Sequence, residues 1–224
     1  IRALYCDEEQ TLWIGTKGGG IVRINNYSPD KEALTSFDRI FTANSTLTDN
    51  AVYCFAPSTT GKLWIGTENG INYYSYQSKQ LKEFPVVADN KKVKYVHSIN
   101  ELNDTTLWVS TVGEGIVKVI LNNTGSSPVV KSATRIVLDK GRMASNYFFT
   151  SFQESDSILW FGNRGYGAYR LNVETGEMTP YKFDDVVKSQ TANDIFAIYK
   201  NEKGYWLGTS SGLLHLNQDY SHRH

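Results

Sequence analysis

The sequence has few prolines and cysteines, no excess of either charge and no long apolar run. Its 224 residues include five prolines and two cysteines. The 23 basic and 23 acidic side chains cancel, so no basic field exists to attract a phosphate backbone or an anionic membrane. No apolar run reaches the roughly 18 residues that a membrane-spanning helix needs. We therefore expect no nucleic-acid partner and no direct membrane insertion by this segment.

One short motif recurs five times along the chain. Its first copy is Leu12-Trp13-Ile14-Gly15-Thr16, and successive copies are separated by 51, 44, 52 and 46 residues. Every tryptophan of the chain stands in this motif, at Trp13, Trp64, Trp108, Trp160 and Trp206. A repeat of this length, built from short apolar runs and turns, is typical of propellers and related arrays.

Each repeat contains further apolar runs in a fixed order. An alternating run precedes the Trp motif, and a third run follows a glycine placed six or seven residues after the Trp. These glycines are Gly20, Gly70, Gly115, Gly167 and Gly212. A weaker and more polar fourth run follows in the first four repeats, and the fifth repeat ends without one. Four antiparallel strands per repeat is the plan of a propeller blade.

The sequence thus predicts an all-β propeller of four-stranded blades with almost no helix. We expect blades at about residues 1–46, 47–90, 91–139, 140–189 and 190–217, the last incomplete, followed by a tail at 218–224. They are either five blades of a larger ring or a five-bladed ring with one three-stranded blade. Because the chain begins at Ile1 inside a repeat, we expect it to belong to a longer polypeptide. The tryptophans should fill the space between neighbouring blades, and the glycine turns and inter-blade loops should share one rim.

The cysteines and histidines do not form a site pattern. Cys6 and Cys54 fall on corresponding strands of neighbouring repeats, so we expect two separate buried or half-buried thiols rather than a bridge. The four histidines have no ligand spacing, and they are His97, His215, His222 and His224. We expect no metal and no cofactor. The run Lys17-Gly18-Gly19-Gly20 connects two strands and opens no helix, which argues against a phosphate loop.

The second repeat, at residues 47–53 and 61–71, is similar to the two-component regulator propeller repeat. The other copies resemble it more loosely, because Ser110 replaces the usual glycine, Asn163 the threonine and Tyr205 the leucine. The resemblance implies the periplasmic sensor region of a hybrid two-component histidine kinase of Bacteroidetes. In that family, tandem propellers detect oligosaccharides from polysaccharide breakdown and signal through a dimer. Its kinase, receiver, immunoglobulin-like domain and membrane span have no counterpart in this segment.

The richest candidate binding segments lie on loops that enter and belong to the fourth blade. Sugar recognition uses planar aromatic rings together with Arg and Asn side chains. The candidate ligand-binding residues are Arg142, Asn146, Tyr147, Arg164 and Tyr166. The competing interpretation is that Tyr147 packs under its loop and that the arginines are solvated.

Three functions are compatible with the sequence, and the first is favoured. It is a non-catalytic sensor segment that binds an oligosaccharide, contacts further blades or domains of its parent chain and forms a homodimer. The second is a propeller glycosidase or lyase acting on polysaccharide, which needs a carboxylate pair about 5–10 Å apart. The candidate rim carboxylates are scattered over four loops, at Asp49, Glu68, Glu114 and Asp194. The third is a scaffold for protein contacts, which needs an exposed apolar patch.

Overall fold

The apolar runs and glycine turns fold into antiparallel sheets joined by turns and loops. The computed structural model describes residues 1–30, 37–122, 127–138, 146–183 and 193–221. Its strands form five sheets of consecutive antiparallel strands, here called blades 1 to 5, and one small hairpin. Across these ranges no helix is long and apolar enough to cross a membrane. The predicted all-β propeller of repeated blades is confirmed.

The strands of each blade follow chain order from the inside outward. Blade 1 contains β1 (Ala3–Cys6), β2 (Leu12–Gly15), β3 (Ile21–Ile24) and β4 (Phe37–Ile40). Blade 2 contains β5 (Val52–Pro57), β6 (Lys62–Thr67), β7 (Gly70–Ser75) and β8 (Gln80–Phe84). The hairpin that follows pairs β9 (Val87–Ala88) with β10 (Lys91–Lys92).

The remaining blades keep this plan. Blade 3 contains β11 (Val96–Asn103), β12 (Thr106–Thr111), β13 (Ile116–Asn122) and β14 (Val129–Ile136). Blade 4 contains β15 (Phe148–Ser155), β16 (Ile158–Asn163), β17 (Ala168–Asn172) and β18 (Met178–Tyr181). Blade 5 contains β19 (Ile195–Asn201), β20 (Gly204–Thr209) and β21 (Gly212–Leu216), so within the described ranges it has three strands.

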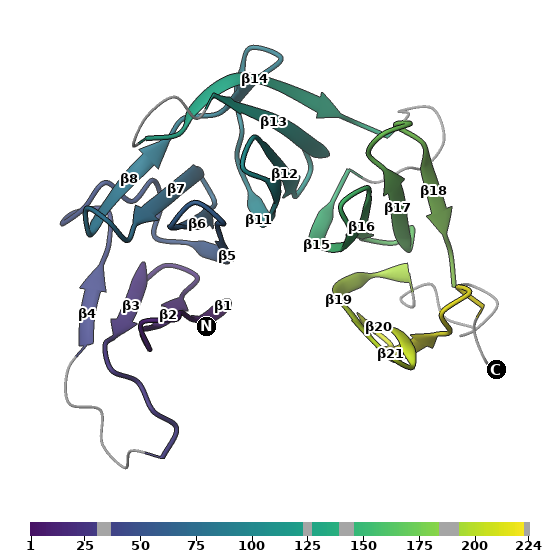
Figure 1. Cartoon of the computed structure of the whole chain (residues 1–224), viewed down its shortest axis with the longest axis horizontal. Helices are drawn as coiled ribbons and strands as arrows, with labels where there is room; N and C mark the ends of the chain where they lie inside the picture. Colours follow the sequence, from purple (N-terminus) through teal and green to yellow (C-terminus); the bar gives the residue numbers. More distant parts are fainter. Residues whose placement is uncertain (31–36, 123–126, 139–145, 184–192, 222–224) are drawn as a thin grey trace.

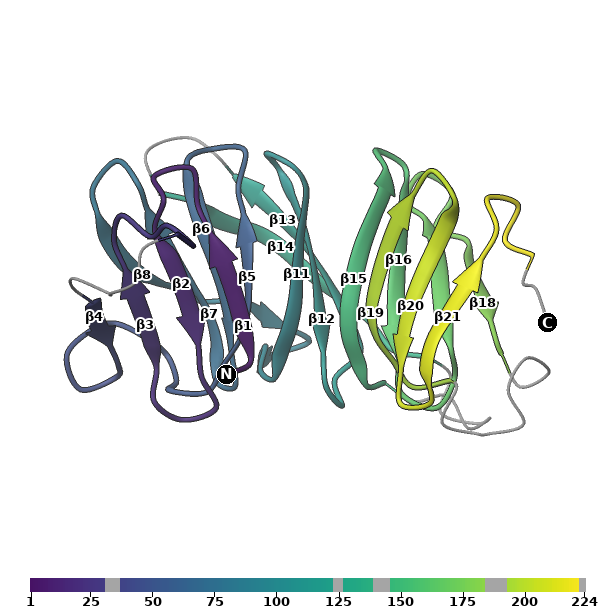
Figure 2. The ribbon, with the colours of Figure 1, turned by 90° about the horizontal axis from the view of Figure 1, so that it is seen from below.

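The blades follow one another along an arc, with blade 1 and blade 5 at its two ends (Figure 1). The first strands β1, β5, β11, β15 and β19 lie nearest the centre of the arc, and the fourth strands lie at its outside. Seen from the side, the inner strands run along a common direction (Figure 2). Residues from all five first strands line one cavity at the centre of the arc.

Each of the first four tryptophans packs against the blade that follows it. Trp13 lies with its ring centroid 4.9 Å from that of Tyr74 in blade 2, and Trp160 lies 5.3 Å from Tyr205 in blade 5. The indoles of blades 1 to 4 are at most 3% exposed. Trp206, in the last blade, is half-exposed. The predicted role of the tryptophans between blades therefore holds for the first four.

The glycine of the motif allows the next blade to approach. A Cβ on Gly66 would lie 2.7 Å from the carbonyl oxygen of Val96, and a Cβ on Gly162 would lie 2.7 Å from that of Ile195. Both oxygens belong to the first strand of the following blade, and real Cβ atoms do not come so close. Close blade packing therefore requires glycine at these positions.

Threonine and glycine close the turn between the second and third strands. Thr16 and Thr111 donate their hydroxyl protons to the carbonyl oxygens of Gly20 and Gly115, at 2.9 and 2.6 Å. These glycines have φ values of 72° and 83°, a region that side chains disfavour. The turns on this rim are thus fixed by the repeat itself.

The predicted tail at 218–224 includes one packed residue. The Tyr220 ring lies 5.5 Å from that of Trp160 and 5.7 Å from that of Tyr181. Its hydroxyl donates a 3.1 Å hydrogen bond to Glu154. Tyr220 therefore belongs to the core between blades 4 and 5, and residues 222–224 lie outside the described residues.

Candidate functional site

The first strands of blades 2 to 5 share a β-bulge at the start of the strand. In blade 2 the register shifts between Val52 and Cys54, and the same shift recurs in blades 3, 4 and 5. A bulge leaves one residue outside the ladder and redirects its side chain. The residues in this position are Tyr53, His97, Phe149 and Phe196, and the register of β1 with β2 gives Arg2 the same position in blade 1.

These five side chains, here called the bulge row, follow the inner edge of the blades. The rings of Tyr53 and His97 stack with their centroids 4.1 Å apart. The His97 ring meets Phe149 edge to face at 5.5 Å, and Phe149 lies 5.0 Å from Phe196. The row thus carries one planar group from each of blades 2 to 5 in continuous contact.

The bulge row lines a cavity of about 520 Å³ at the centre of the arc. This volume is within the range of small-molecule sites. All five bulge-row residues contribute to the wall, together with Ser98 and Thr150 and apolar side chains of the first strands. The Tyr53 hydroxyl donates a 2.9 Å hydrogen bond to Glu68, which stands in the turn between β6 and β7. The Tyr53 hydroxyl therefore reaches the rim that carries the glycine turns.

One of the residues that line the cavity carries a formal charge at neutral pH. Burial, followed by the nearby Arg2 guanidinium, lowers the pKa of His97 to about 4, so the imidazole is neutral at pH 7. Burial and then the Glu68 carboxylate raise the pKa of Tyr53 to about 12. Burial also raises the pKa of the Cys54 thiol to about 12. Among the lining residues, Arg2 alone is charged at neutral pH.

This arrangement is suited to binding rather than to acid–base chemistry. Phe196 ends the row and is 47% exposed, so a planar ligand can extend the stack there. Arg2 offers charged donors at the other end of the row. No carboxylate is among the residues that line the cavity. The described cavity wall thus lacks the acid pair that glycoside hydrolysis uses.

Asn146, a candidate ligand residue, joins blade 4 to the loops of blade 3. Its side-chain oxygen accepts a 2.8 Å hydrogen bond from the Leu138 amide. Its carbonyl oxygen accepts hydrogen bonds from the amides of Gly113 and Gly115, at 3.0 and 3.1 Å. Asn50 holds the corresponding place before blade 2, where its carbonyl accepts from Gly20. Asn146 therefore has a structural role that Asn50 repeats, and its ligand-binding role stays a prediction.

Of the other candidate ligand-binding residues on blade 4, the structure brings Tyr147 and Arg164 together. Tyr147 is 41% exposed, and its carbonyl oxygen accepts a 3.0 Å hydrogen bond from the amide of the exposed Arg164. The partly buried Tyr166 packs on the core between blades 3 and 4, with the Lys182 ammonium 6.0 Å above its ring. Arg142 lies outside the described residues. Tyr147 and Arg164 therefore remain accessible, while Tyr166 has an additional packing role.

The four rim carboxylates each have local partners. Asp49 accepts from the Ala51 amide and Glu68 accepts from Tyr53. Glu114 pairs with Arg135 at 2.8 Å, and Asp194 accepts from Ser210 at 3.1 Å. Each of these contacts lies within one blade or the loop that enters it.

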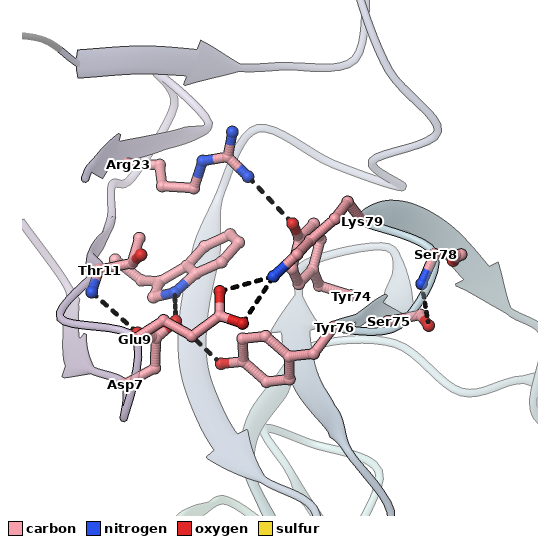
Figure 3. A network of polar contacts seen from close by, with 10 residues as sticks. Asp7, Glu9, Thr11, Arg23, Tyr74, Ser75, Tyr76, Ser78 and Lys79 are labelled. Atoms are coloured by element: carbon pink, nitrogen blue, oxygen red, sulfur yellow. Dashed lines mark hydrogen bonds and ion pairs between the residues drawn. The ribbon is translucent and has the colours of Figure 1, made fainter. Parts of the chain in front are cut away.

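A network of polar side chains connects blades 1 and 2 (Figure 3). Asp7 is buried and accepts three hydrogen bonds, from the Thr11 amide, the Trp13 indole and the Tyr76 hydroxyl, at 2.8, 2.8 and 3.1 Å. At the exposed edge of the network Lys79 pairs with Glu9 at 2.6 Å. The network ties the two blades together.

Cys6 and Cys54 are both free thiols, as the absence of a predicted bridge requires. Cys54 is half-buried as expected, but Cys6 is exposed, which corrects the expectation of a buried or half-buried thiol there. In the described ranges, no three His, Cys, Asp or Glu side chains are grouped so that they could hold a metal ion.

The bulge row was not predicted, although the residues that form it share one feature in the sequence. A large planar side chain follows the first apolar residue of the strand in Val52-Tyr53, Val96-His97, Phe148-Phe149 and Ile195-Phe196. Along a regular strand these side chains would alternate into the inter-blade packing. The β-bulge itself cannot be recognised in the sequence. It directs these side chains into the central cavity instead.

Comparison with known proteins finds similarity to a repeat and to proteins of bacterial two-component systems. Residues 46–69 match the family model described as two component regulator propeller. Histidine kinase P4 of Formosa agariphila is 26% identical over 217 residues, which cover 95% of this chain and 15% of that protein.

The fold is shared with several solved structures. The extracellular domains of two proteins of B. thetaiotaomicron, both described as hybrid two component systems, align at 20% and 18% identity with TM-scores of 0.79 and 0.69. Each alignment covers at least 99% of this chain and about 30% of the other chain. An inactive virginiamycin B lyase from Staphylococcus aureus aligns at 18% identity with a TM-score of 0.67, over 98% of this chain and 67% of that one. The chain thus spans 15% of the histidine kinase and about 30% of the two extracellular domains. The resemblance of its second repeat is confirmed, and the chain is a β-propeller that carries the two component regulator propeller repeat.

Proposed function

We propose that this chain is a non-catalytic, ligand-sensing propeller segment of an extracytoplasmic sensor of the hybrid two-component type. Its ligand is an oligosaccharide from polysaccharide breakdown, and its compartment is the periplasm. The repeat family, the kinase relative and the extracellular neighbours support the sensor role. The observation that carries the binding role is the bulge row, which presents planar groups from successive blades to one cavity.

The proposed mechanism is binding without turnover. A sugar ring stacks on the open face of Phe196, and hydroxyl or carboxylate groups of the ligand accept hydrogen bonds from Arg2. Because the cavity is lined by the first strands of all five blades, a ligand there contacts several blades at once. A difference in affinity between two arrangements of a homodimer then changes their populations, and that change passes to the kinase.

The test is a calorimetric titration of the chain against a panel of neutral and acidic oligosaccharides, with release of new sugar ends measured in the same samples. Phe196→Ala and Arg2→Ala remove the two ends of the bulge row, and we expect at least tenfold weaker binding in each. Arg164→Ala and Tyr147→Ala are matched controls on the rim of blade 4, and we expect them to bind as the unmodified chain does.

Each other result changes the proposal in a defined way. Loss of binding in the blade 4 variants alone would place the site on that rim and contradict a site in the central cavity. Release of new sugar ends would contradict the non-catalytic role and favour a polysaccharide enzyme, whose fold class includes the aligned lyase. No binding across the panel would contradict oligosaccharide recognition by these five blades.

A further inference from the structure

A second cavity, here called the turn cavity, lies between blades 1 and 2. It has a volume of about 260 Å³ and is bordered by the β1–β2 turn of blade 1 and the β5–β6 turn of blade 2. Tyr5 and Tyr76, both half-buried, contribute to its wall. Because the strands are antiparallel, the β1–β2 turn lies on the rim opposite the glycine turns. The turn cavity is therefore separate from the cavity at the centre of the arc.

At two other interfaces, a polar side chain of the first strand crosses to the turn of the preceding blade. The position that crosses pairs with the residue before the Trp, and its occupants in blades 2 to 5 are Pro57, Glu101, Gln153 and Lys200. Glu101 accepts hydrogen bonds from the amide and the hydroxyl of Thr59 in blade 2, at 2.9 and 2.8 Å. The Lys200 ammonium lies 3.5 Å from the Glu154 carboxylate of blade 4. Pro57 has no polar group that could cross to blade 1 in this way.

The interface of blades 4 and 5 resembles that of blades 1 and 2 in its carboxylate. Asp7 and Glu154 each precede the Trp by six residues and accept from its indole. Each also accepts from a tyrosine hydroxyl of the next blade, Tyr76 or Tyr220, at 3.1 Å. Glu154 pairs in addition with Lys200, whereas within the described ranges Asp7 forms no ion pair. An ionised carboxylate has about four acceptor positions, so Asp7 keeps one after its three hydrogen bonds.

Carboxylates outnumber cations on the wall of the turn cavity. Its acidic residues are Asp7, Glu8 and Glu9, and Lys62 is the cation among the lining residues. The Lys62 ammonium donates a 2.9 Å hydrogen bond to the Thr60 hydroxyl of its own turn. Glu8 is exposed at the mouth of the cavity. The wall is therefore suited to a ligand of positive charge.

The tyrosines of the wall stand close to these charges. Burial, followed by the Asp7 and Glu8 carboxylates, raises the pKa of Tyr5. Lys79 pairs with Glu9 at 2.6 Å, and its ammonium lies 5.8 Å from the centroid of the Tyr76 ring (Figure 3). The combination of an aromatic face and a carboxylate thus already receives an ammonium group beside the cavity. Organic cations are attracted to aromatic faces in this way.

We propose that the turn cavity binds a small alkylamine as its ammonium ion. The nitrogen takes the place against Asp7 that Lys200 takes against Glu154, with Glu8 as a second carboxylate, and the apolar stem lies along Tyr5 and Tyr76. The volume is below the roughly 300 Å³ at which drug-sized sites begin, so it suits a short alkyl chain. The inference goes beyond the proposed function and does not rest on it, because the site uses no residue of the bulge row.

The test titrates the full chain with n-butylamine at neutral pH and follows the indole N–H resonances by NMR. The Trp13 indole donates to Asp7, so we expect its resonance to shift and to reach a plateau. The comparison ligand is n-butanol, which has the same stem without the charge, and we expect no shift with it. Lysine blocked at both backbone ends forms a third arm. Binding of butylamine alone assigns the cavity to free amines, and binding of both extends the proposal to a lysine side chain.

Substitutions locate the site. Pro57→Lys gives blade 2 the residue that blade 5 has at Lys200, and we expect it to abolish amine binding. Pro57→Ala is its matched control and should keep the binding. Glu8→Gln should weaken amine binding about threefold, as expected for the loss of one exposed charge pair. Glu174→Gln removes an equal charge from an exposed loop of blade 4 and should have no effect.

Four results would overturn the proposal. They are an unmoved Trp13 resonance, equal responses to butylamine and butanol, and equal effects of Glu8→Gln and Glu174→Gln, the last of which would indicate unspecific attraction to surface charge. The fourth is amine binding by Pro57→Lys as strong as that by Pro57→Ala, in folded chains of equal circular dichroism. In that case the ammonium would not occupy the place that Lys200 has in blade 5.

Discussion

The indole Nε1 of Trp13 donates a 2.8 Å hydrogen bond to Oδ2 of Asp7, six positions earlier in the same hairpin. Trp160 and Glu154 repeat the relationship in blade 4 at 2.6 Å and the same spacing. An indole buried between blades must find an acceptor for its one donor, because an unpaired buried donor costs free energy. Blades 1 and 4 therefore share a carboxylate six residues before the Trp, whereas the Trp64 indole donates to Glu101 of blade 3.

Asp7→Ala should destabilise the chain by about 2–3 kcal/mol, because three donors lose one buried charged acceptor. They are the Thr11 amide, the Trp13 indole and the Tyr76 hydroxyl. Urea unfolding followed by circular dichroism measures the change. Glu8→Ala, one residue away and exposed, is the control and should be neutral within about 0.5 kcal/mol. Equal stability of the two variants would show that the network does not tie blades 1 and 2.

Leu102→Glu should stabilise blade 3 by about 1 kcal/mol. Trp108 is the one motif tryptophan whose buried Nε1 has no hydrogen-bond partner among the described atoms, and Leu102 holds the place six residues before it. A glutamate there supplies the acceptor that Glu154 supplies in blade 4. Leu102→Met keeps the apolar contact without an acceptor and serves as the control. A lower unfolding midpoint for Leu102→Glu than for Leu102→Met would contradict this account.

Gly66→Ala and Gly208→Ala form a matched pair at one motif position. On Gly66 the added methyl would meet the Cys54 sulfur and lie 2.7 Å from the Val96 carbonyl oxygen. On Gly208 it would lie no closer than 3.4 Å to Ala197. We expect Gly66→Ala to cost about 1–3 kcal/mol of stability and Gly208→Ala to be nearly neutral. Comparable losses in thermal unfolding would show that the glycine serves the strand and not the blade contact.

The repeated part of the fold could be predicted from the sequence because two features of each repeat, the Trp motif and the turn glycine, have fixed structural roles. The Trp motif must bury its indole and bring the next blade close, and the turn glycine must adopt positive φ, so both leave residues that recur in the same order in each repeat. Within the described ranges blade 5 has three strands, and its sequence lacks the fourth apolar run that the other repeats contain. The hairpin of β9 and β10 was not predicted, since two-residue strands leave no periodic signal.

The candidate site was predicted less well, for a physical reason. Arg164 and Tyr147 were chosen because arginine and aromatic side chains on a loop suit sugar recognition, and the structure leaves both accessible. The bulge row follows the repeat, with Tyr53 and Phe196 in positions that an unbroken strand would turn into the inter-blade packing. A bulge adds one residue without a distinctive side chain, so the change of direction is visible only in the register.

His97 should make the stability of the chain depend on pH between about 6.5 and 4. Its ordinary pKa is 6.5, and burial together with Arg2 lowers its pKa in the folded chain to about 4. Between these values the unfolded state binds a proton that the folded state does not. The free energy of unfolding therefore falls as the pH is lowered from 6.5, and the fall from this residue ends near pH 4.

The pH dependence is isolated by comparing the chain with His97→Phe, which keeps a planar ring in the bulge row. Urea unfolding at pH 7.5, 5.5 and 4.5 should show a smaller loss of stability for the variant than for the unmodified chain, because carboxylates contribute equally to both. Arg2→Ala should raise the pKa of His97 toward its ordinary value in an NMR titration, since the guanidinium repels the imidazolium. Titration of His97 near 6.5 in the unmodified chain would show an open, hydrated row, and stacking between Tyr53 and His97 could not then organise the cavity.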